Sequence, residues 1–192
     1  MGIKMGKPIV INRELSELDE FVLEVVKLIE KHASYVIVSG YVTILFGRSR
    51  GTEDVDFVIE RIPEQRFLRM CDEAEARGFE FLNPEDCSGL YEMPVEKMGI
   101  RMARRGEMIP NAEIKFPKDY FPREALERRI PVELSGRRIY ISPIELQIAY
   151  KLYLGSDKDF EDAFFLYELF KDNLDGAMLR EYAKRLDVEV PF

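Results

Sequence analysis

The chain has 192 residues, of which 46% are hydrophobic, 33% charged and 11% aromatic. This length allows one domain, or a small domain with a helical appendage, and this composition excludes collagen-like and wholly disordered chains. The formal net charge of −8 argues against a protein that coats nucleic acid or anionic membranes without specificity.

Thiol and imidazole chemistry is not expected. The sequence has two cysteines, Cys71 and Cys87, and one histidine, His32, which are too few for a disulfide scaffold or a four-ligand zinc site. No apolar run approaches a membrane span of about 18 residues, and residues 1–15 lack the apolar centre of a signal peptide. We therefore expect a cytoplasmic protein with no membrane partner. The low content of Asn and Gln among 64 charged residues is typical of thermophile proteins.

The first half of the chain is predicted to alternate helices and strands. Apolar residues recur at helical spacing from 15 to 31, which predicts an amphipathic helix. A β-branched run at residues 35–38 predicts a strand that ends at a Ser39-Gly40 turn and is followed by a short helix. After a loop, residues 54–59 form a second predicted strand.

The next segments predict further strands around an irregular stretch. Residues 63–77 predict a helix, because a proline opens it and a glycine follows its end. Residues 79–97 contain two prolines and a glycine and are expected to be irregular. Strands are expected at 99–103 and 112–116, and residues 130–141 predict a hairpin with a Ser-Gly turn.

The end of the chain is predicted to be helical. The segment Ser142-Pro143-Ile144-Glu145 has the spacing of a capping box with proline at the first helical position, and it predicts a helix that ends near residue 154. Two more helices are predicted at 159–170 and 175–186. We therefore expect two domains, an α/β domain over 1–141 and a C-terminal helical domain over 142–192.

Two aspartates of the second predicted strand form a candidate metal site. Asp54 and Asp56 are two residues apart, so their side chains project from one face while Val55 and Phe57 point to the other. Two carboxylates this close repel each other unless a metal ion or a basic group compensates them, and together they suit a hard cation. The alternative is a pair of solvated acids at the start of a strand.

The Ser39-Gly40 turn is a candidate phosphate site. A strand-to-helix turn with a glycine leaves backbone N–H groups free at a helix N-terminus, where they suit a phosphate. Alone, this dipeptide is most often only a turn. The pattern becomes specific because thirteen residues separate Gly40 from Asp54, and because Arg50 and Thr52 stand at alternate positions before the aspartates.

The stretch VIVSGYVTILFGRSRGTEDVDFVI resembles the signature of the nucleotidyltransferase superfamily, which has the polymerase-β-like fold. It is most similar to the AbiEii-type toxins and related archaeal and bacterial proteins, with their Gly-Gly-x(13)-Asp-x-Asp and Arg-x-Thr-x-Asp-x-Asp motifs. Gly40 matches the second glycine, while Ser39 stands where the first is usual. The resemblance implies an α/β (α+β) fold, with a small mixed nucleotidyltransferase sheet flanked by helices and followed by a C-terminal helical bundle.

The family has a third carboxylate on a later strand, between apolar residues. Glu113, in the predicted strand 112–116, is the best match. Glu133, in the predicted hairpin, is a rival, and either glutamate has the alternative of being an ordinary exposed strand residue.

The helical part carries a second motif. The segment ISPIELQIAYKLYLGSDKDFEDAFFLYEL resembles the AbiEii-type pattern in which one helix ends with lysine and the next begins Lys-Asp-x-x-Asp. Lys151 matches the first lysine, and Lys158, Asp159 and Asp162 match the second motif. The alternatives are that Lys151 is a solvated helix lysine and that Asp159 only caps its helix.

The resemblance implies a Mg²⁺-dependent nucleotide transfer from a nucleoside triphosphate (NTP) to an acceptor hydroxyl. Asp54, Asp56 and Glu113 would hold two Mg²⁺ ions, with Glu113 helping to deprotonate the acceptor. The remaining matched residues would bind the nucleotide: Ser39 and Gly40 at the turn, Thr52 in the motif, Arg50 and Lys151 as cations, and Asp159 and Asp162 as residues that orient Lys151 or read the base or acceptor.

The acceptor is suggested only by a basic strip. Residues 97–138 contain eleven Lys or Arg against six Asp or Glu, with three aromatic residues between them. Basic side chains interleaved with aromatic rings suit RNA, so RNA or tRNA is the expected partner. The resemblance to AbiEii-type toxins implies the role of a toxin with an antitoxin protein. The alternatives are a strip of paired charges, transfer to a small molecule or a protein, and a non-catalytic binding module that retains the fold.

Overall fold

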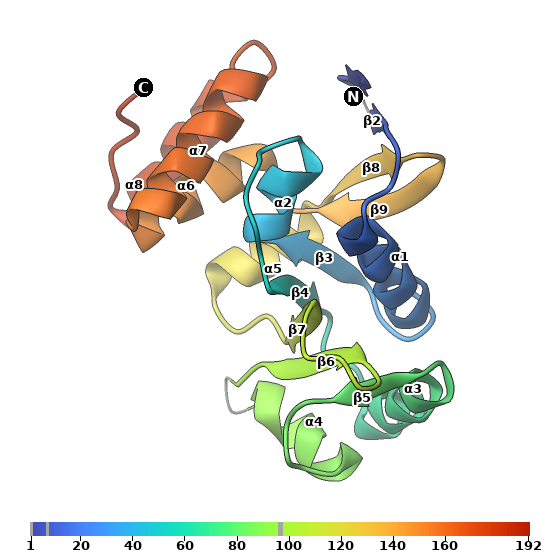
Figure 1. Ribbon diagram of the computed structural model, residues 1–192. Helices are drawn as coiled ribbons and strands as arrows, with labels where there is room; N and C mark the ends of the chain where they lie inside the picture. Colours follow the sequence, from blue (N-terminus) through green and yellow to red (C-terminus); the bar gives the residue numbers. More distant parts are fainter. Residues whose placement is uncertain (1, 7, 96–97) are drawn as a thin grey trace.

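One mixed β-sheet forms the centre of the computed structural model, which describes residues 2–6, 8–95 and 98–192 (Figure 1). Residues 96 and 97, at the end of the segment expected to be irregular and at the start of the basic strip, lie outside the described residues. The elements in chain order are β1 Gly2–Lys4, β2 Ile9–Asn12, α1 Glu17–Ile29, β3 Tyr35–Val38, α2 Gly40–Leu45, β4 Asp54–Ile59, α3 Glu64–Ala76, β5 Phe79–Phe81, α4 Cys87–Val95, β6 Ile100–Arg104, β7 Asn111–Lys115, α5 Tyr120–Glu127, β8 Ile130–Leu134, β9 Arg137–Ile141, α6 Ile144–Leu154, α7 Asp157–Phe170 and α8 Gly176–Leu186.

The strand order brings carboxylate side chains from distant segments together in the middle of the sheet. In the described residues the sheet has nine strands in the order β1-β2-β8-β9-β3-β4-β7-β6-β5. Strand β4 pairs antiparallel with β3 and parallel with β7. The register places Asp56 opposite Val38 on one side and Glu113 on the other. Because side chains alternate along a strand, Asp54, Asp56 and Glu113 share one face.

The opposite face of β4 carries the hydrophobic core. Val55, Phe57 and Ile59 are fully buried there, and helices α1 and α5 lie on opposite sides of β3 (Figure 1). This burial is the main favourable contribution to folding. It also fixes the register of β4, since a slip of one residue would move the aspartates into the core.

A buried carboxylate attaches α1 to α2. Ser16 and Asp19 form a capping box at the start of α1, in which each side chain accepts a hydrogen bond from the other residue's backbone N–H. Asp19 is fully buried, and one of its oxygens lies 2.7 Å from Arg13 Nη1. The Tyr41 hydroxyl donates to the other oxygen at 2.7 Å. Because Tyr41 belongs to α2, this network fixes the helix that follows the Ser39-Gly40 turn.

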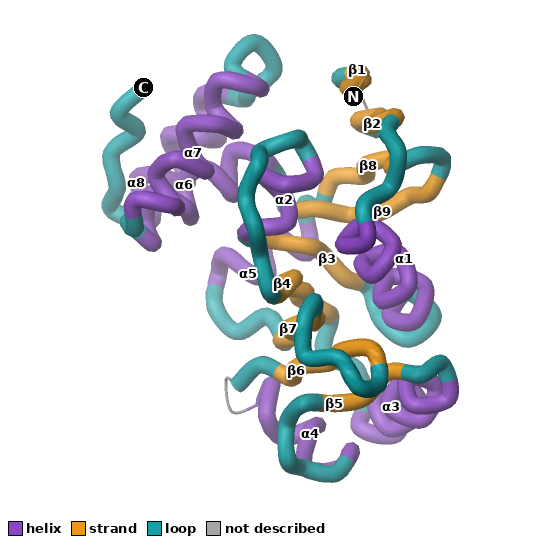
Figure 2. Tube along the Cα trace, viewed as in Figure 1, coloured by secondary structure: helices purple, strands orange, loops and turns teal. Residues whose placement is uncertain are grey.

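The last three helices pack on one another at one side of the sheet (Figure 2). Helix α6 contacts both α7 and α8, and α7 also contacts α2. The predicted capping box at Ser142 is wrong. The Ser142 hydroxyl donates instead to Gln147 Oε1 at 2.9 Å, and Glu145 accepts from the backbone N–H of Asp175, so α6 begins at Ile144 without a side-chain cap.

The predicted fold class is confirmed, since the sheet is mixed, helices flank it and helices follow it. Three elements, β1, β2 and α5, were not predicted from the sequence, and β5 and α4 lie in the segment that was predicted to be irregular. The strands are only three or four residues long, and α4 and α5 each contain a proline, so their sequence patterns are weak. Within the described part of the chain, no helix is long and apolar enough to cross a membrane.

Candidate active site

The three predicted carboxylates lie on one face of two neighbouring strands. Asp54 and Asp56 belong to β4, and Glu113 belongs to β7 directly opposite Asp56. All three are partly buried. The rival Glu133 lies on β8, and β9 and β3 separate that strand from β4. Of the two glutamates, Glu113 is therefore the one beside the aspartates.

A lysine that the sequence analysis did not assign to the site lies between two of these carboxylates. The Lys115 ammonium is 2.8 Å from Glu113 Oε2 and 3.2 Å from Asp56 Oδ1. Burial raises the pKa of Asp56; the ammonium offsets part of this rise, and the Glu113 carboxylate adds to it. Burial also opposes charge on Lys115, but the two carboxylates outweigh it and raise the lysine pKa. Lys115 is thus the basic group that compensates the repulsion between the carboxylates.

The donor chemistry of the carboxylates suits a hard cation such as Mg²⁺, which prefers carboxylate oxygens. Among the described residues, no group of three or more His, Cys, Asp or Glu side chains lies close enough together to hold a metal ion. The cation between Asp56 and Glu113 is the Lys115 ammonium. A metal ion at this position would have to displace it.

Thr52 fixes the start of β4. Its hydroxyl donates to the backbone carbonyl of Asp54 at 2.9 Å and lies 3.3 Å from Asp54 Oδ1. These bonds orient the first aspartate, so Thr52 contacts the carboxylate side of the site.

The turn between β3 and α2 has a conformation that glycine adopts most easily. Ser39 has φ 63° and ψ −137°, in a region that costs a residue with a side chain about 1–3 kcal/mol. The Gln147 side chain holds this turn, because its amide donates to the Ser39 carbonyl at 2.7 Å. A side chain at the next residue, Gly40, would displace Arg50, since an added Cβ would lie 2.7 Å from one of its guanidinium nitrogens.

A fully buried carboxylate, Asp162, gathers the cations that the sequence analysis assigned to nucleotide binding. It forms ion pairs with Arg50, with Lys151 at 2.9 Å and with Arg48 at 2.8 Å. Arg48, which the sequence analysis missed, also pairs with Glu161 at 2.6 Å. The cluster joins α6 and α7 to the loop between α2 and β4.

Two alternatives for the helical motif are wrong. Lys151 is not a solvated lysine, since it is 3% exposed and its ammonium donates to Asp159 at 2.7 Å. Asp159 does not cap its helix, because Ser156 is the N-cap and accepts from the Asp159 N–H. Burial opposes charge on Asp159, but hydrogen bonds from Lys151 and Ser156 hold its pKa below the usual range. Lys158 is exposed on α7.

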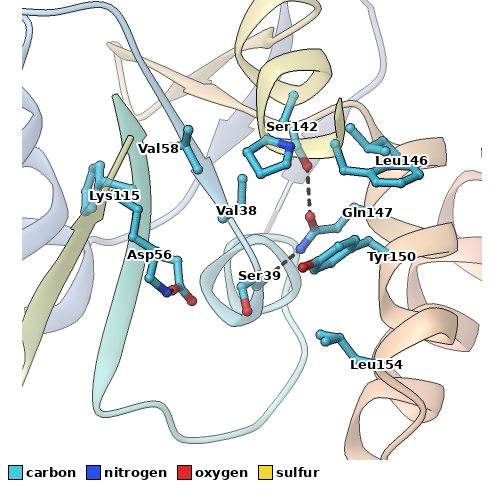
Figure 3. A pocket seen from close by; sticks show the side chains of 14 residues that line it. Val38, Ser39, Asp56, Val58, Lys115, Ser142, Leu146, Gln147, Tyr150 and Leu154 are labelled. Carbon is cyan, nitrogen blue, oxygen red and sulfur yellow. Dashed lines mark hydrogen bonds and ion pairs between the residues drawn. The ribbon is translucent and has the colours of Figure 1, made fainter. Parts of the chain in front are cut away.

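A pocket of about 270 Å³ opens beside the carboxylates (Figure 3). It lies between the sheet face and helices α5 and α6, and its lining includes Val38, Ser39, Asp56, Lys115, Gln147 and Tyr150. Figure 3 shows Gln147 bonded to Ser142 and to the backbone of Ser39, across the pocket from Asp56 and Lys115. One end of the pocket is therefore charged and adjoins the turn.

One of the solved structures compared with this chain shares its architecture. No protein-family model matches the chain, and no curated protein does. Among solved structures it is similar to an antigenic nucleotidyltransferase-like protein from Paracoccidioides brasiliensis, with 18% identity and a TM-score of 0.53 over 87% of this chain and 85% of that one. The fold is nucleotidyltransferase-like. The lincosamide antibiotic adenylyltransferase LnuA, bound to lincomycin, has 15% identity and a TM-score of 0.48 over 80% of this chain and 98% of its own.

The nucleotidyltransferase-like sheet divides the basic strip. Arg101 and Arg104 lie on β6 and Arg137 and Arg138 on β9, with β7, β4 and β3 between these strands. Several members of the strip form contacts within the protein: Arg104 with Glu24, Arg128 with Glu124, Arg129 with the Tyr35 carbonyl, and Lys115 with the carboxylates. The described part of the strip therefore does not form one continuous surface.

The strain at Ser39 predicts a stabilising substitution. Ser39→Gly removes the steric cost of φ 63° and is expected to raise the free energy of unfolding by about 1 kcal/mol, after the entropy cost of glycine in the unfolded chain. Urea titration measures the change. Ser39→Ala keeps the Cβ atom and serves as the control, and an equal gain from alanine would show that the backbone is not the cause.

The raised pKa of Asp56 predicts a pH-dependent stabilisation by asparagine. The folded protein holds the Asp56 proton more tightly than the unfolded chain, so stability present at low pH is lost as pH rises through this pKa. Asp56→Asn removes that loss and should raise Tm at neutral pH, with the gain vanishing in acid. Scanning calorimetry from pH 4 to 8 tests this, with the exposed Asp72→Asn as a control that changes little. A lower Tm for Asp56→Asn at neutral pH would contradict it.

Asp162 is expected to hold the helical part to the sheet. Asp162→Asn leaves the buried cations without their common partner and should cost about 3–5 kcal/mol, the usual loss when one member of a buried ion pair is removed. Denaturant unfolding gives the value. Asp157→Asn, at an exposed position of the same helix, should cost under about 1 kcal/mol, and similar costs for both variants would refute a special role of Asp162.

Proposed function

We propose that the protein transfers a nucleoside monophosphate from an NTP to an acceptor hydroxyl. The observation that carries the proposal is the position of Asp54, Asp56 and Glu113 on one sheet face beside the Ser39-Gly40 turn. Paired carboxylates at a strand-to-helix turn combine a cation site with backbone N–H groups that suit phosphate. The nucleotidyltransferase-like fold supports this reading.

In this proposal Asp54, Asp56 and Glu113 would hold Mg²⁺ after their side chains move closer together and the Lys115 ammonium moves away. The bound ion would supply positive charge against the phosphate oxygens. Glu113 accepts the proton of the acceptor hydroxyl. The acceptor oxygen then forms a bond to the α-phosphorus, and the bond from that phosphorus to pyrophosphate breaks. Pyrophosphate leaves with the electron pair of the broken bond.

The cations of the Asp162 cluster would serve the triphosphate in two different ways. Arg50 packs against Gly40, so its guanidinium is next to the turn proposed for phosphate. Lys151 is enclosed by Asp159 and Asp162. We assign it the role of a cation held in place for the nucleotide, with the two aspartates as its positioning residues.

RNA and a small molecule are the two candidate acceptors. The basic strip and the resemblance to AbiEii-type toxins favour RNA or tRNA, with an antitoxin protein as partner. The separation of β6 from β9 in the sheet weakens the RNA reading, because the basic residues do not share one surface. The pocket beside Asp56 favours a small-molecule acceptor.

Nucleotide transfer is testable with labelled substrates. The protein, Mg²⁺ and each α-labelled NTP are incubated with total RNA or with a small-molecule extract, and label is followed into either fraction. Asp56→Asn and Glu113→Gln should each reduce transfer by about 100-fold or more, because they remove groups that act in the reaction itself. Glu133→Gln, three strands away from β4, should retain activity.

The outcomes separate the candidate functions. Full transfer by Asp56→Asn would refute the metal assignment, and loss of transfer in Glu133→Gln but not in Glu113→Gln would exchange the two glutamates. Transfer by none of the proteins, together with Mg²⁺-dependent triphosphate binding in calorimetry, would indicate a binding module that retains the fold.

A further inference from the structure

The pocket beside Asp56 is lined by apolar side chains on two sides. Val38 and Val58 come from the sheet face, and their strands pair so that both side chains lie on the face that carries Asp56. Pro122 and Ala125 of α5 and Leu146 of α6 form the opposite wall. A pocket with apolar side chains on two sides favours the binding of flat groups, because both faces of a ring lose contact with water.

The charged groups of the pocket lie at one end. Asp56, Lys115 and Ser39 adjoin the candidate active site. Deeper in the lining, Ser142 and Gln147 are nearly fully buried and bond to each other, and Gln147 also bonds to the Ser39 carbonyl. Because these two side chains already have partners, they do not require hydrogen bonds from an apolar ligand.

A row of aromatic rings borders the pocket. Phe121 of α5 and Tyr150 of α6 both line it, with ring centroids 6.1 Å apart at an angle of 43°. Tyr153 continues the row at 5.8 Å from Tyr150 but does not line the pocket. Tyr150 is 37% exposed, so part of its ring is open to a further stacking partner.

The size of the pocket limits the ligand. Pockets for drug-sized molecules have volumes of about 300–1,000 Å³, and this one, at about 270 Å³, is slightly smaller. It accommodates one compact ring system and excludes a nucleic acid duplex or a folded peptide segment.

We propose that this pocket is a subsite for one flat ring that stacks its faces on Phe121 and Tyr150 and carries a polar substituent toward Asp56. That this ring belongs to a substrate rests on the proposed function. The ring has two sources at this site, the base of the NTP or the body of a small hydroxyl-bearing acceptor, and both share this chemistry.

The binding test uses probes of known structure. Methyl resonances of Val38, Val58 and Leu146 are followed by NMR while the protein is titrated with 2-phenylethanol, ATP or inorganic tripolyphosphate in Mg²⁺ buffer. A ring-bearing probe should shift these methyl resonances. Tyr150→Ala should weaken its binding by about fivefold through loss of stacking, whereas Tyr153→Ala on the same helix should change it less than about twofold.

The probes distinguish the two sources. If the base occupies the pocket, ATP binds more tightly than tripolyphosphate, Tyr150→Ala removes that difference, and 2-phenylethanol competes with ATP. If an acceptor occupies it, 2-phenylethanol and ATP bind together, and Tyr150→Ala weakens only 2-phenylethanol. Either result supports the subsite.

A second variant tests the pocket independently of Tyr150→Ala. Ala125→Met adds side-chain volume in the wall of the pocket and should block ring binding while tripolyphosphate binding is retained. The proposal is overturned if no ring-bearing probe shifts the methyl resonances up to its solubility limit, or if Tyr150→Ala and Tyr153→Ala weaken binding equally. Ring binding without any nucleotide transfer would refute only the proposed function.

Discussion

The fully buried carboxylate of Asp162 is the interaction on which the arrangement of the candidate site depends. It forms ion pairs with three cations, from the loop after α2 and from α6, while its own backbone belongs to α7. A buried charge is stable only when its partners satisfy it, so the loop and both helices must take their positions together. The turn that carries Gly40 is part of this assembly, because Arg50 packs on that glycine.

A second group of charges lies inside the site. Asp56 and Glu113 face each other on paired strands, and the Lys115 ammonium forms ion pairs with both. The partial loss of water from these three charged groups costs folding free energy. Stability would favour an uncharged group at Asp56. A charge that lowers stability at a partly buried position is typical of functional sites.

Local sequence patterns predicted the parts of the site that depend on local geometry. The shared face of Asp54 and Asp56 follows from the two-residue period of a strand. The partner of Asp56 depends instead on the pairing of β4 with β7, which are far apart in the sequence. The motif therefore favoured Glu113 but left Glu133 as a rival, and it did not reveal the role of Lys115. The pocket was not predictable either, because α5 has a weak helical pattern and its packing against α6 is a tertiary contact.

The parallel pairing of β4 with β7 also determines when the site is formed during folding. The two strands are separated by more than fifty residues, which include α3, α4, β5 and β6. Contacts of this range form slowly, because a long loop must be closed before they contribute free energy. A partly folded chain therefore presents Asp54 and Asp56 without Glu113 or the Lys115 ammonium. The cluster of Asp56, Glu113 and Lys115 is thus expected to form late in folding, as a property of the completed sheet.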